Sequence, residues 1–238
     1  MGFQILTYCS QAYLPALEWV LPSWTRPDVE QIHVVSDFGP MGSQASWEKQ
    51  NVVWHPDYEP SEDWFINNTR RAEVAWKYAP SSGLWAFLDL DCWIRGDVLP
   101  AFGPPNTISV TRFWSKERHT GGTITDGTWY ANMGPNVKVF LGRWVELTKS
   151  MGRFKAAHGR ATTQQYAFTK LCRDAFRTGV PCHINTVPEQ IYNCEHSVPA
   201  RLIKKASENS PVVIHFKGGT WNNAQFVKRV LRAAGDKP

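Results

Sequence analysis

The chain has 238 residues, of which 42% are hydrophobic and 20% are charged, as is typical of a globular protein with a sizeable core. It has no run of about 18 apolar residues, so no membrane span is expected. The net charge of +5 is spread along the sequence, whereas nucleic-acid-binding proteins usually show a dense basic stripe, so no nucleic-acid partner is expected. Part of this excess suits an anionic ligand such as a nucleotide diphosphate, and most of it is expected to be solvated surface.

The five cysteines are an odd number and include no C-x-x-C pair. The sequence therefore indicates neither a disulfide framework nor a zinc cluster. The N-terminal segment lacks the basic region and long apolar run of a signal peptide, and it is more typical of a first strand. We expect a reduced, cytoplasmic setting.

The first half of the sequence alternates short apolar runs with amphipathic segments. Strands are predicted at residues 3–8, 32–36, 51–54 and 84–91, and helices at residues 12–24 and 61–78. Ser10 is a candidate N-cap of the first helix. The resulting order, strand–helix–strand–strand–helix–strand, predicts an α/β fold with a mostly parallel sheet covered by helices on both faces.

The second half has a less regular pattern. It predicts strands at residues 106–111 and 211–216, and helices at residues 137–149, 162–176 and 223–234. Residues 120–128 are rich in glycine and threonine and have no helical period, so they form either a loop or a hairpin. We find no internal repeat and no linker, and we predict a single domain over residues 1–238.

Asp89 and Asp91 close the apolar run LWAFLDLD at residues 84–91. Two carboxylates at the end of a buried strand are unfavourable unless a cation lies between them. Alternate residues of a strand point to opposite faces, so both carboxylates reach one ion only if the strand ends there and the chain turns. We expect that turn at residues 92–97, where Gly96 relaxes the backbone. Mg²⁺ and Mn²⁺ prefer such oxygen ligands and often bind together with phosphates. The alternative is that the two aspartates only form a turn at the strand end, where aspartate is common.

Two segments together resemble a known family. The run ending in LDLD resembles the D-x-D motif of GT-A-fold glycosyltransferases, and IHFKGGTW at residues 214–221 resembles the H-F-x-G-x-x-K-P-W segment of their glycogenin-like, retaining members. The resemblance implies a Rossmann-like domain that binds a nucleotide sugar. Residues 1–97 would form the nucleotide-sugar-binding half, and residues 98–238 the acceptor-side half with the C-terminal metal-binding segment.

The same resemblance implies a metal site. Asp89, Asp91 and His215 would bind Mn²⁺ or Mg²⁺, and Lys217 and Gly218 would lie near the phosphates. The family's K-P pair is absent, so phosphate contact would fall to Lys217 or to backbone N–H groups. The alternative for His215 is a core histidine that ligates nothing.

Other residues are candidates for the donor pocket. Ligands of open α/β sheets lie beyond the carboxyl ends of the strands, so Thr7, Tyr8, Ser10 and Asp37 are expected to line a base and ribose pocket. Helix capping by Ser10 and turn formation by Asp37 are the alternatives.

The resemblance adds further candidates. It implies a basic residue near the first aspartate or the phosphates, and either Arg70 or Arg71 is expected to face inward. Asn132, in the segment WYANMG, would bind the donor sugar. Gln164 occupies the region of the family's D-Q pair. Asp126 and Glu195 are candidates for acceptor contact.

The sequence as a whole predicts a metal-dependent glycosyltransferase of the hexosyltransferase type, which moves a sugar from a UDP- or GDP-sugar to a carbohydrate or glycan acceptor. The resemblance of the C-terminal segment to glycogenin-like members favours retention of configuration, and the lack of a clear candidate base supports it more weakly. One alternative is a nucleotidyltransferase of nucleotide-sugar synthesis, although CSQAY at residues 9–13 is not the basic, glycine-rich loop of those enzymes. Another is a non-catalytic carbohydrate-binding domain that uses the twelve tryptophans.

Overall fold

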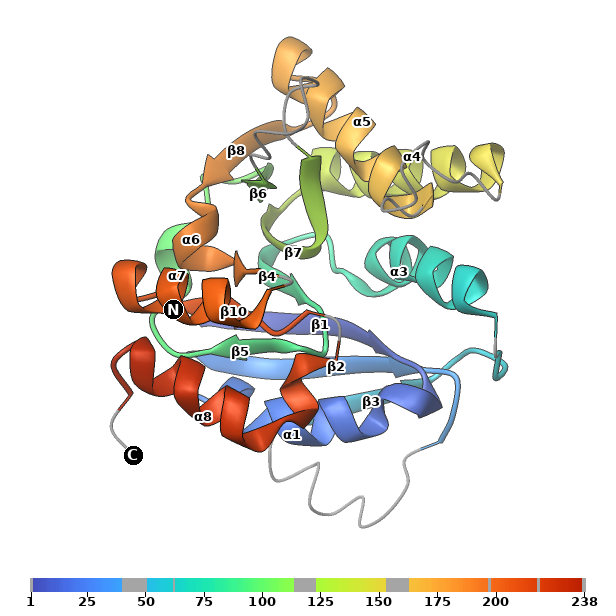
Figure 1. Cartoon of the computed structure of the whole chain (residues 1–238). Coiled ribbons are helices and arrows are strands. Elements are labelled where there is room, and N and C mark those ends of the chain that lie inside the picture. The colour runs from blue at the N-terminus through green and yellow to red at the C-terminus, as the bar shows by residue number, and fades with distance from the viewer. Residues whose placement is uncertain are drawn as a thin grey trace.

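A computed structural model of the chain describes residues 2–39, 51–61, 63–113, 123–152, 163–196, 198–217 and 219–236. These residues form an α/β structure with a seven-stranded sheet, a three-stranded sheet and helices on both faces of the larger sheet (Figure 1). The predicted fold class is confirmed. In the described part of the chain, no helix is both long enough and apolar enough to cross a bilayer.

The first half supplies four strands of the large sheet that are parallel to one another. Its elements are β1 (Phe3–Cys9), η1 (Gln11–Tyr13), α1 (Leu14–Trp24), β2 (Val29–Ser36), β3 (Val52–Pro56), α3 (Trp64–Tyr78) and β4 (Gly83–Leu88). The pairs β1–β2, β2–β3 and β1–β4 are all parallel. The predicted order of strands and helices is confirmed here, because short apolar runs and longer amphipathic segments have distinct periods.

The second half completes the large sheet. Its elements are β6 (Thr107–Phe113), β7 (Thr123–Met133), α4 (Pro135–Met151), α5 (Thr163–Thr178) and β8 (His183–Val187), and the strand order is β3-β2-β1-β4-β7-β6-β8. Strand β7 runs antiparallel to both of its neighbours. Residues 123–128 of the glycine- and threonine-rich segment belong to β7, whereas residues 120–122 lie outside the described residues.

A small sheet joins the middle of the chain to its end. Its strands are β5 (Cys92–Ile94), β9 (Cys194–Glu195) and β10 (Val213–His215). The remaining helices of this part of the chain are η2 (Leu99–Ala101), α6 (Glu189–Tyr192), α7 (Pro199–Asn209), η3 (Thr220–Asn222) and α8 (Ala224–Ala233). Strand β10 lies between β5, to which it is antiparallel, and β9, to which it is parallel. This sheet brings residues separated by more than a hundred positions into contact.

The alternation of side chains along β1 shows how the two faces are covered. Leu6 and Tyr8 pack in the cluster that also holds the buried residues of α3, α4 and α5, while Ile5 and Cys9 pack with α1 on the other face. Helices α3, α4 and α5 accordingly lie on one side of the sheet in Figure 1, and α1 lies on the other. Because both faces are buried, the central strands β1 and β4 are mostly apolar.

Candidate functional site

The two aspartates of the D-x-D segment lie in a turn between two strands. Strand β4 ends at Leu88 and β5 begins at Cys92, and the Cys92 N–H donates to the Asp89 carbonyl at 3.0 Å. The prediction that the strand ends at the aspartates is confirmed. The predicted turn at residues 92–97 is wrong in position, because residues 92–94 pair with β10 and the chain has already turned at residues 89–91.

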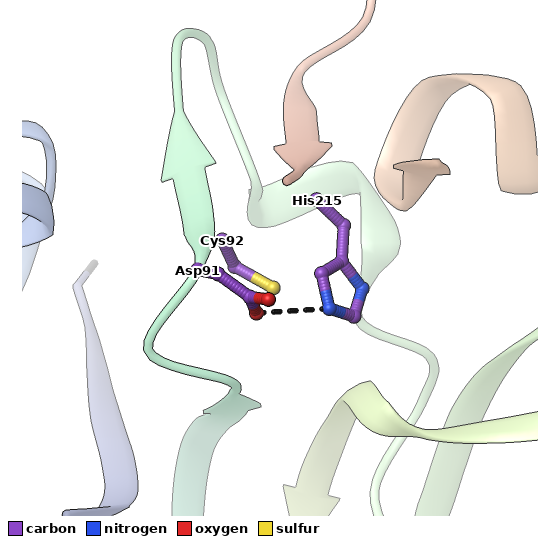
Figure 2. A group of neighbouring side chains, drawn as sticks. All are labelled: Asp91, Cys92 and His215. Atoms are coloured by element: carbon purple, nitrogen blue, oxygen red, sulfur yellow. Dashed lines mark ion pairs between the residues drawn. The ribbon is translucent and has the colours of Figure 1, made fainter. Parts of the chain in front are cut away.

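His215 meets these aspartates because β10 pairs with β5 in the register that sets His215 opposite Cys92. Its Nε2 atom lies 2.9 Å from Asp91 Oδ1 and 3.7 Å from Asp89 Oδ2. Figure 2 shows the imidazole and the Asp91 carboxylate pointing toward one another from the two strand ends. Burial lowers the pKa of His215, but Cys92 and Asp91 raise it more, and the net pKa is well above its ordinary value.

The donor set fits a hard divalent cation. Two carboxylates and an imidazole suit Mg²⁺ or Mn²⁺, and neighbouring ligands of an octahedral ion at ~2.1 Å lie about 3 Å apart. The ligand atoms of Asp91, Cys92 and His215 all lie within 4.8 Å of one another, so the Cys92 sulfur is also close. A thiolate ligand would favour softer metals. The Cys92 Sγ, however, lies 3.3 Å from the Thr128 hydroxyl, at hydrogen-bonding distance, so Cys92 already has a partner within the protein.

Gly127 leaves room for this cluster. Leu88 of β4 pairs with Thr128 of β7, and this register places Gly127 beside Asp89. The Asp89 N–H donates to the Gly127 carbonyl at 2.8 Å. A Cβ atom at Gly127 would collide with the Asp89 carboxylate and lie 3.3 Å from His215 Cε1. Sequence reasoning did not identify Gly127, because its partner lies far away in the chain.

Arg70 and Arg71 both face inward, so the prediction that only one would do so is wrong. Arg71 forms an ion pair with Asp89. Arg70 donates to the Tyr8 hydroxyl at 3.0 Å and lies 3.6 Å from Asp37. Successive residues of a helix are about 100° apart, and here the two side chains extend toward different strand ends.

A cavity of 490 Å³ lies at the carboxyl ends of β1 and β4. It is lined by Tyr8, Ser10, Ala12, Tyr13, Ala16, Asn67, Arg71, Asp89, Leu90, Asp91, Gly219 and Trp221. This is the edge at which open α/β sheets bind their ligands. The structure therefore brings Tyr8, Ser10, Arg71 and both aspartates together around one space.

Thr7 and Asp37 lie beside the cavity without lining it. The Thr7 hydroxyl donates to the Leu88 carbonyl at 2.7 Å and so links β1 to β4. Asp37 accepts from the Gln11 N–H at 2.9 Å, which makes it the residue that anchors the start of η1. Ser10 precedes η1 without a side-chain capping bond, so its hydroxyl does not serve as the predicted cap.

Asn132 lies at the other end of the sheet. It pairs with Leu84 at the start of β4, and its side chain donates to the Gly103 carbonyl at 3.0 Å. The physical reason is the direction of β7: it runs antiparallel to β4, so its beginning and not its end lies beside Asp89. Gly127 and Asp126 occupy that beginning.

Asp126 and Gln164 form a buried pair. Both side chains are almost fully buried, at 5% and 1% exposure, and Gln164 hydrogen-bonds Asp126. Burial raises the pKa of Asp126, although Arg71 and the Gln164 hydrogen bond lower it. Neither residue belongs to the described lining of the cavity.

Glu195 is also buried and contacts the far side of His215. Its Oε2 atom lies 3.2 Å from His215 Nδ1, and the Lys217 amine lies 2.7 Å from the same oxygen. Burial raises the pKa of Glu195, but the hydrogen bond and charge of His215, together with Lys217, lower it to about 2. Gly218 lies outside the described residues. Asn193, which was not predicted from the sequence, lies on the same side of the histidine, and its Oδ1 atom accepts from His215 Nδ1 at 3.0 Å.

Comparison with known proteins finds likeness in structure alone. No protein-family model and no curated protein matches the chain. The glycosyltransferase GlyE of Streptococcus pneumoniae TIGR4 superposes with a TM-score of 0.62 at 12% identity, over 100% of this chain and 61% of that one. The chain thus spans about three fifths of the GlyE chain.

Two other solved structures match over nearly their whole length. The galactosyltransferase LgtC, in complex with donor and acceptor sugar analogues, has a TM-score of 0.57 at 13% identity, over 99% of this chain and 97% of that one. Mouse xyloside xylosyltransferase 1 has a TM-score of 0.55 at 12% identity, over 92% and 99%. Together with the strand order and the cavity at the strand ends, these matches show that the chain has the GT-A-like fold of glycosyltransferases.

Proposed function

We propose that this protein is a metal-dependent glycosyltransferase that moves a sugar from a nucleotide-diphosphate donor to the hydroxyl of a carbohydrate or glycan acceptor. The observation that carries the proposal is the meeting of Asp89, Asp91 and His215 at the edge of a 490 Å³ cavity. In this proposal residues 1–97 supply most of the donor site, and residues 98–238 supply the acceptor side and the metal-binding histidine.

The charges around the cavity suit a diphosphate. Asp89, Asp91 and His215 would hold Mn²⁺ or Mg²⁺, which when bound neutralises negative charge on the departing diphosphate. Arg71 lines the same cavity beside Asp89 and adds a second positive charge there. Donors aimed at a developing negative charge stabilise the transition state more than the bound substrate.

The nucleoside part of a UDP- or GDP-sugar would occupy the cavity beyond the carboxyl end of β1. Tyr8, Ser10 and Asn67 line this part and offer hydroxyl and amide groups for the base and ribose. Tyr13 is 49% exposed at the cavity, and aromatic faces of this kind stack on bases and sugar rings.

The carboxylates at the cavity favour retention of configuration. Among the described residues that line the cavity, the carboxylates are Asp89 and Asp91, which this proposal assigns to the metal. An inverting enzyme needs a further carboxylate within reach of the acceptor hydroxyl, whereas in a retaining one the leaving phosphate can take the proton.

Two observations weigh against the rival functions. A nucleotidyltransferase carries a glycine-rich phosphate loop directly after its first strand. Here the chain continues from β1 through Ser10 into η1, with no glycine at residues 9–13. Trp24, Trp129 and Trp144 are almost fully buried and so are not available to stack on a carbohydrate ligand.

Calorimetry with UDP and GDP tests the proposal. We expect nucleotide binding that requires Mn²⁺ or Mg²⁺ and that EDTA abolishes, followed by metal-dependent hydrolysis of one member of a panel of nucleotide sugars. Carbohydrate binding that EDTA leaves unchanged, with no nucleotide binding, would favour a binding domain and contradict the proposal.

A further inference from the structure

The far nitrogen of the His215 ring is held by two buried side chains. Nδ1 lies 3.0 Å from Asn193 Oδ1 and 3.2 Å from Glu195 Oε2. His215, Asn193 and Glu195 are 2%, 0% and 5% exposed. Asn193 directly precedes β9, whose Glu195 pairs with His215 on β10, so the backbone register places all three side chains side by side.

The contacts of Asn193 fix which way its amide points. Its nitrogen lies 3.3 Å from the Thr111 hydroxyl and 3.3 Å from Glu195 Oε2. A carboxylate only accepts, so the amide nitrogen faces Glu195 and the amide oxygen faces the imidazole. The Nδ1 atom of His215 therefore has two acceptors beside it and carries a proton.

The opposite nitrogen is then left for the cavity. A neutral imidazole has one N–H and one lone pair, and a proton held on Nδ1 leaves the lone pair on Nε2. Nε2 is the atom that faces Asp91 and Asp89. Residues that bond the outer nitrogen of a metal-binding histidine set its tautomer and its orientation.

Lys217 keeps the second acceptor in place. Its amine lies 2.8 Å from Glu195 Oε1 and 2.7 Å from Oε2, so the carboxylate is bound on both oxygens. A buried carboxylate without a partner would be unfavourable, and the ion pair offsets that cost.

We propose that Asn193 and Glu195 are positioning residues that hold His215 in the Nδ1-protonated tautomer, with Nε2 directed at the site formed by Asp89 and Asp91. The inference deepens the proposed metal-dependent function and rests on it for the identity of the ligands. Neither residue lines the cavity in the described structure, so their effect on a bound cation acts through the histidine.

Titration of the purified full chain with Mn²⁺, followed by electron paramagnetic resonance, tests the consequence. Asn193→Ala and Glu195→Ala are each expected to raise the Kd for Mn²⁺ about 10- to 100-fold. Glu195→Gln keeps an acceptor for the Nδ1 proton and is expected to stay within about 3-fold of the wild-type protein. Asp28→Asn is the control, because Asp28 is a partly buried carboxylate paired with Arg26 at 3.0 Å before the start of β2, at the end of the sheet opposite the cavity, and its Kd should not change.

Three outcomes would overturn the inference. Folded Asn193→Ala and Glu195→Ala variants that bind Mn²⁺ like the wild type would show that His215 needs no positioning. A loss of Mn²⁺ affinity in Glu195→Gln as large as that in Glu195→Ala would show that the negative charge of Glu195, and not its acceptor for the Nδ1 proton, causes the effect. An equal loss in Asp28→Asn would show that the weaker binding comes from general destabilisation.

A second measurement decides the tautomer when the alanine variants do not fold. In the metal-free wild-type protein, a long-range ¹H–¹⁵N spectrum should show a proton on His215 Nδ1 whether or not Nε2 also carries one, and an Nδ1 atom without a proton would overturn the inference. Absence of Mn²⁺ binding to the wild type would contradict the metal dependence of the proposed function, while this metal-free spectrum still decides the positioning role.

Discussion

At the residue scale, Asp91 Oδ1 lies 2.9 Å from His215 Nε2. Asp91→Asn keeps the shape of the side chain but removes its charge, so we expect turnover with the accepted nucleotide sugar to fall more than about 100-fold, because even outer-shell changes at metal sites cost 10–100-fold. Initial rates at saturating Mn²⁺ measure this, and circular dichroism checks the fold. Asp97→Asn, at an exposed aspartate a few residues along, is the control. An undiminished rate in Asp91→Asn would remove the aspartate from the site.

Gly127 offers a steric test that changes no ligand. The added methyl group of Gly127→Ala would displace the Asp89 carboxylate and press on His215, so Mn²⁺-dependent UDP binding should weaken at least about 10-fold. Gly39→Ala is the matched control, because a Cβ there meets nothing within 4 Å. Calorimetry compares the two variants, and equal Kd values would show that the Asp89 carboxylate can move without affecting the site.

At the element scale, the three-stranded sheet decides where His215 lies. Strand β10 is three residues long, and its antiparallel register with β5 joins His215 to the end of the D-x-D turn. Its parallel register with β9 joins the same residue to Glu195. Helices α7 and α8 pack against this sheet through Leu202, Phe226 and Val230. The stability of these helices therefore supports the position of the histidine.

The N-terminus of α8 can be weakened selectively. The Asn223 side chain caps the helix by accepting from the Phe226 N–H at 3.0 Å. Asn223→Ala should lower the free energy of unfolding by about 1 kcal/mol, and the melting temperature by about 2–4 °C for a chain of this size. The neighbouring Asn222→Ala, which removes an amide at an exposed position outside the cap, is the control. Thermal unfolding followed by circular dichroism measures both, and equal melting temperatures would contradict the capping role.

At the scale of the whole molecule, a histidine pair links stability to pH. His33 Nδ1 lies 3.1 Å from His55 Nε2, and His33 Nε2 lies 2.9 Å from Gln4 Oε1. Burial, with a smaller effect of His55, lowers the pKa of His33 from 6.5 to about 4. The folded state thus favours the neutral ring, so its contribution to stability is present above pH 6.5 and is lost as the pH falls toward 4.

This pH dependence is measurable by urea unfolding between pH 7.5 and 4.5. The wild-type protein should lose stability over this range, and His33→Gln should show a flatter dependence because the titrating ring is gone. His183→Gln, at an exposed histidine on β8, is the control and should follow the wild type. Parallel curves for wild type and His33→Gln would show that the pair does not set the acid limit.

The amino-acid sequence by itself determined the kind and order of the main elements, since apolar runs and amphipathic periods are local properties. It also placed a pair of carboxylates at the end of β4, although the turn was expected a few residues too late, and it indicated the histidine of β10 through a resemblance of motifs. Short elements such as β5, β8 and β9 were not predicted, because two to five residues carry too little periodicity to be recognised.

The tertiary structure alone decided which side chains surround the site. Asn132 lies at the far end of the sheet and Gly127 lies beside Asp89, because β7 runs antiparallel to β4. Asn193 and Glu195 reach His215 because β9 pairs with β10. Strand direction and register are set by hydrogen bonds between segments far apart in the chain, and one reversed strand exchanges the residues at its two ends.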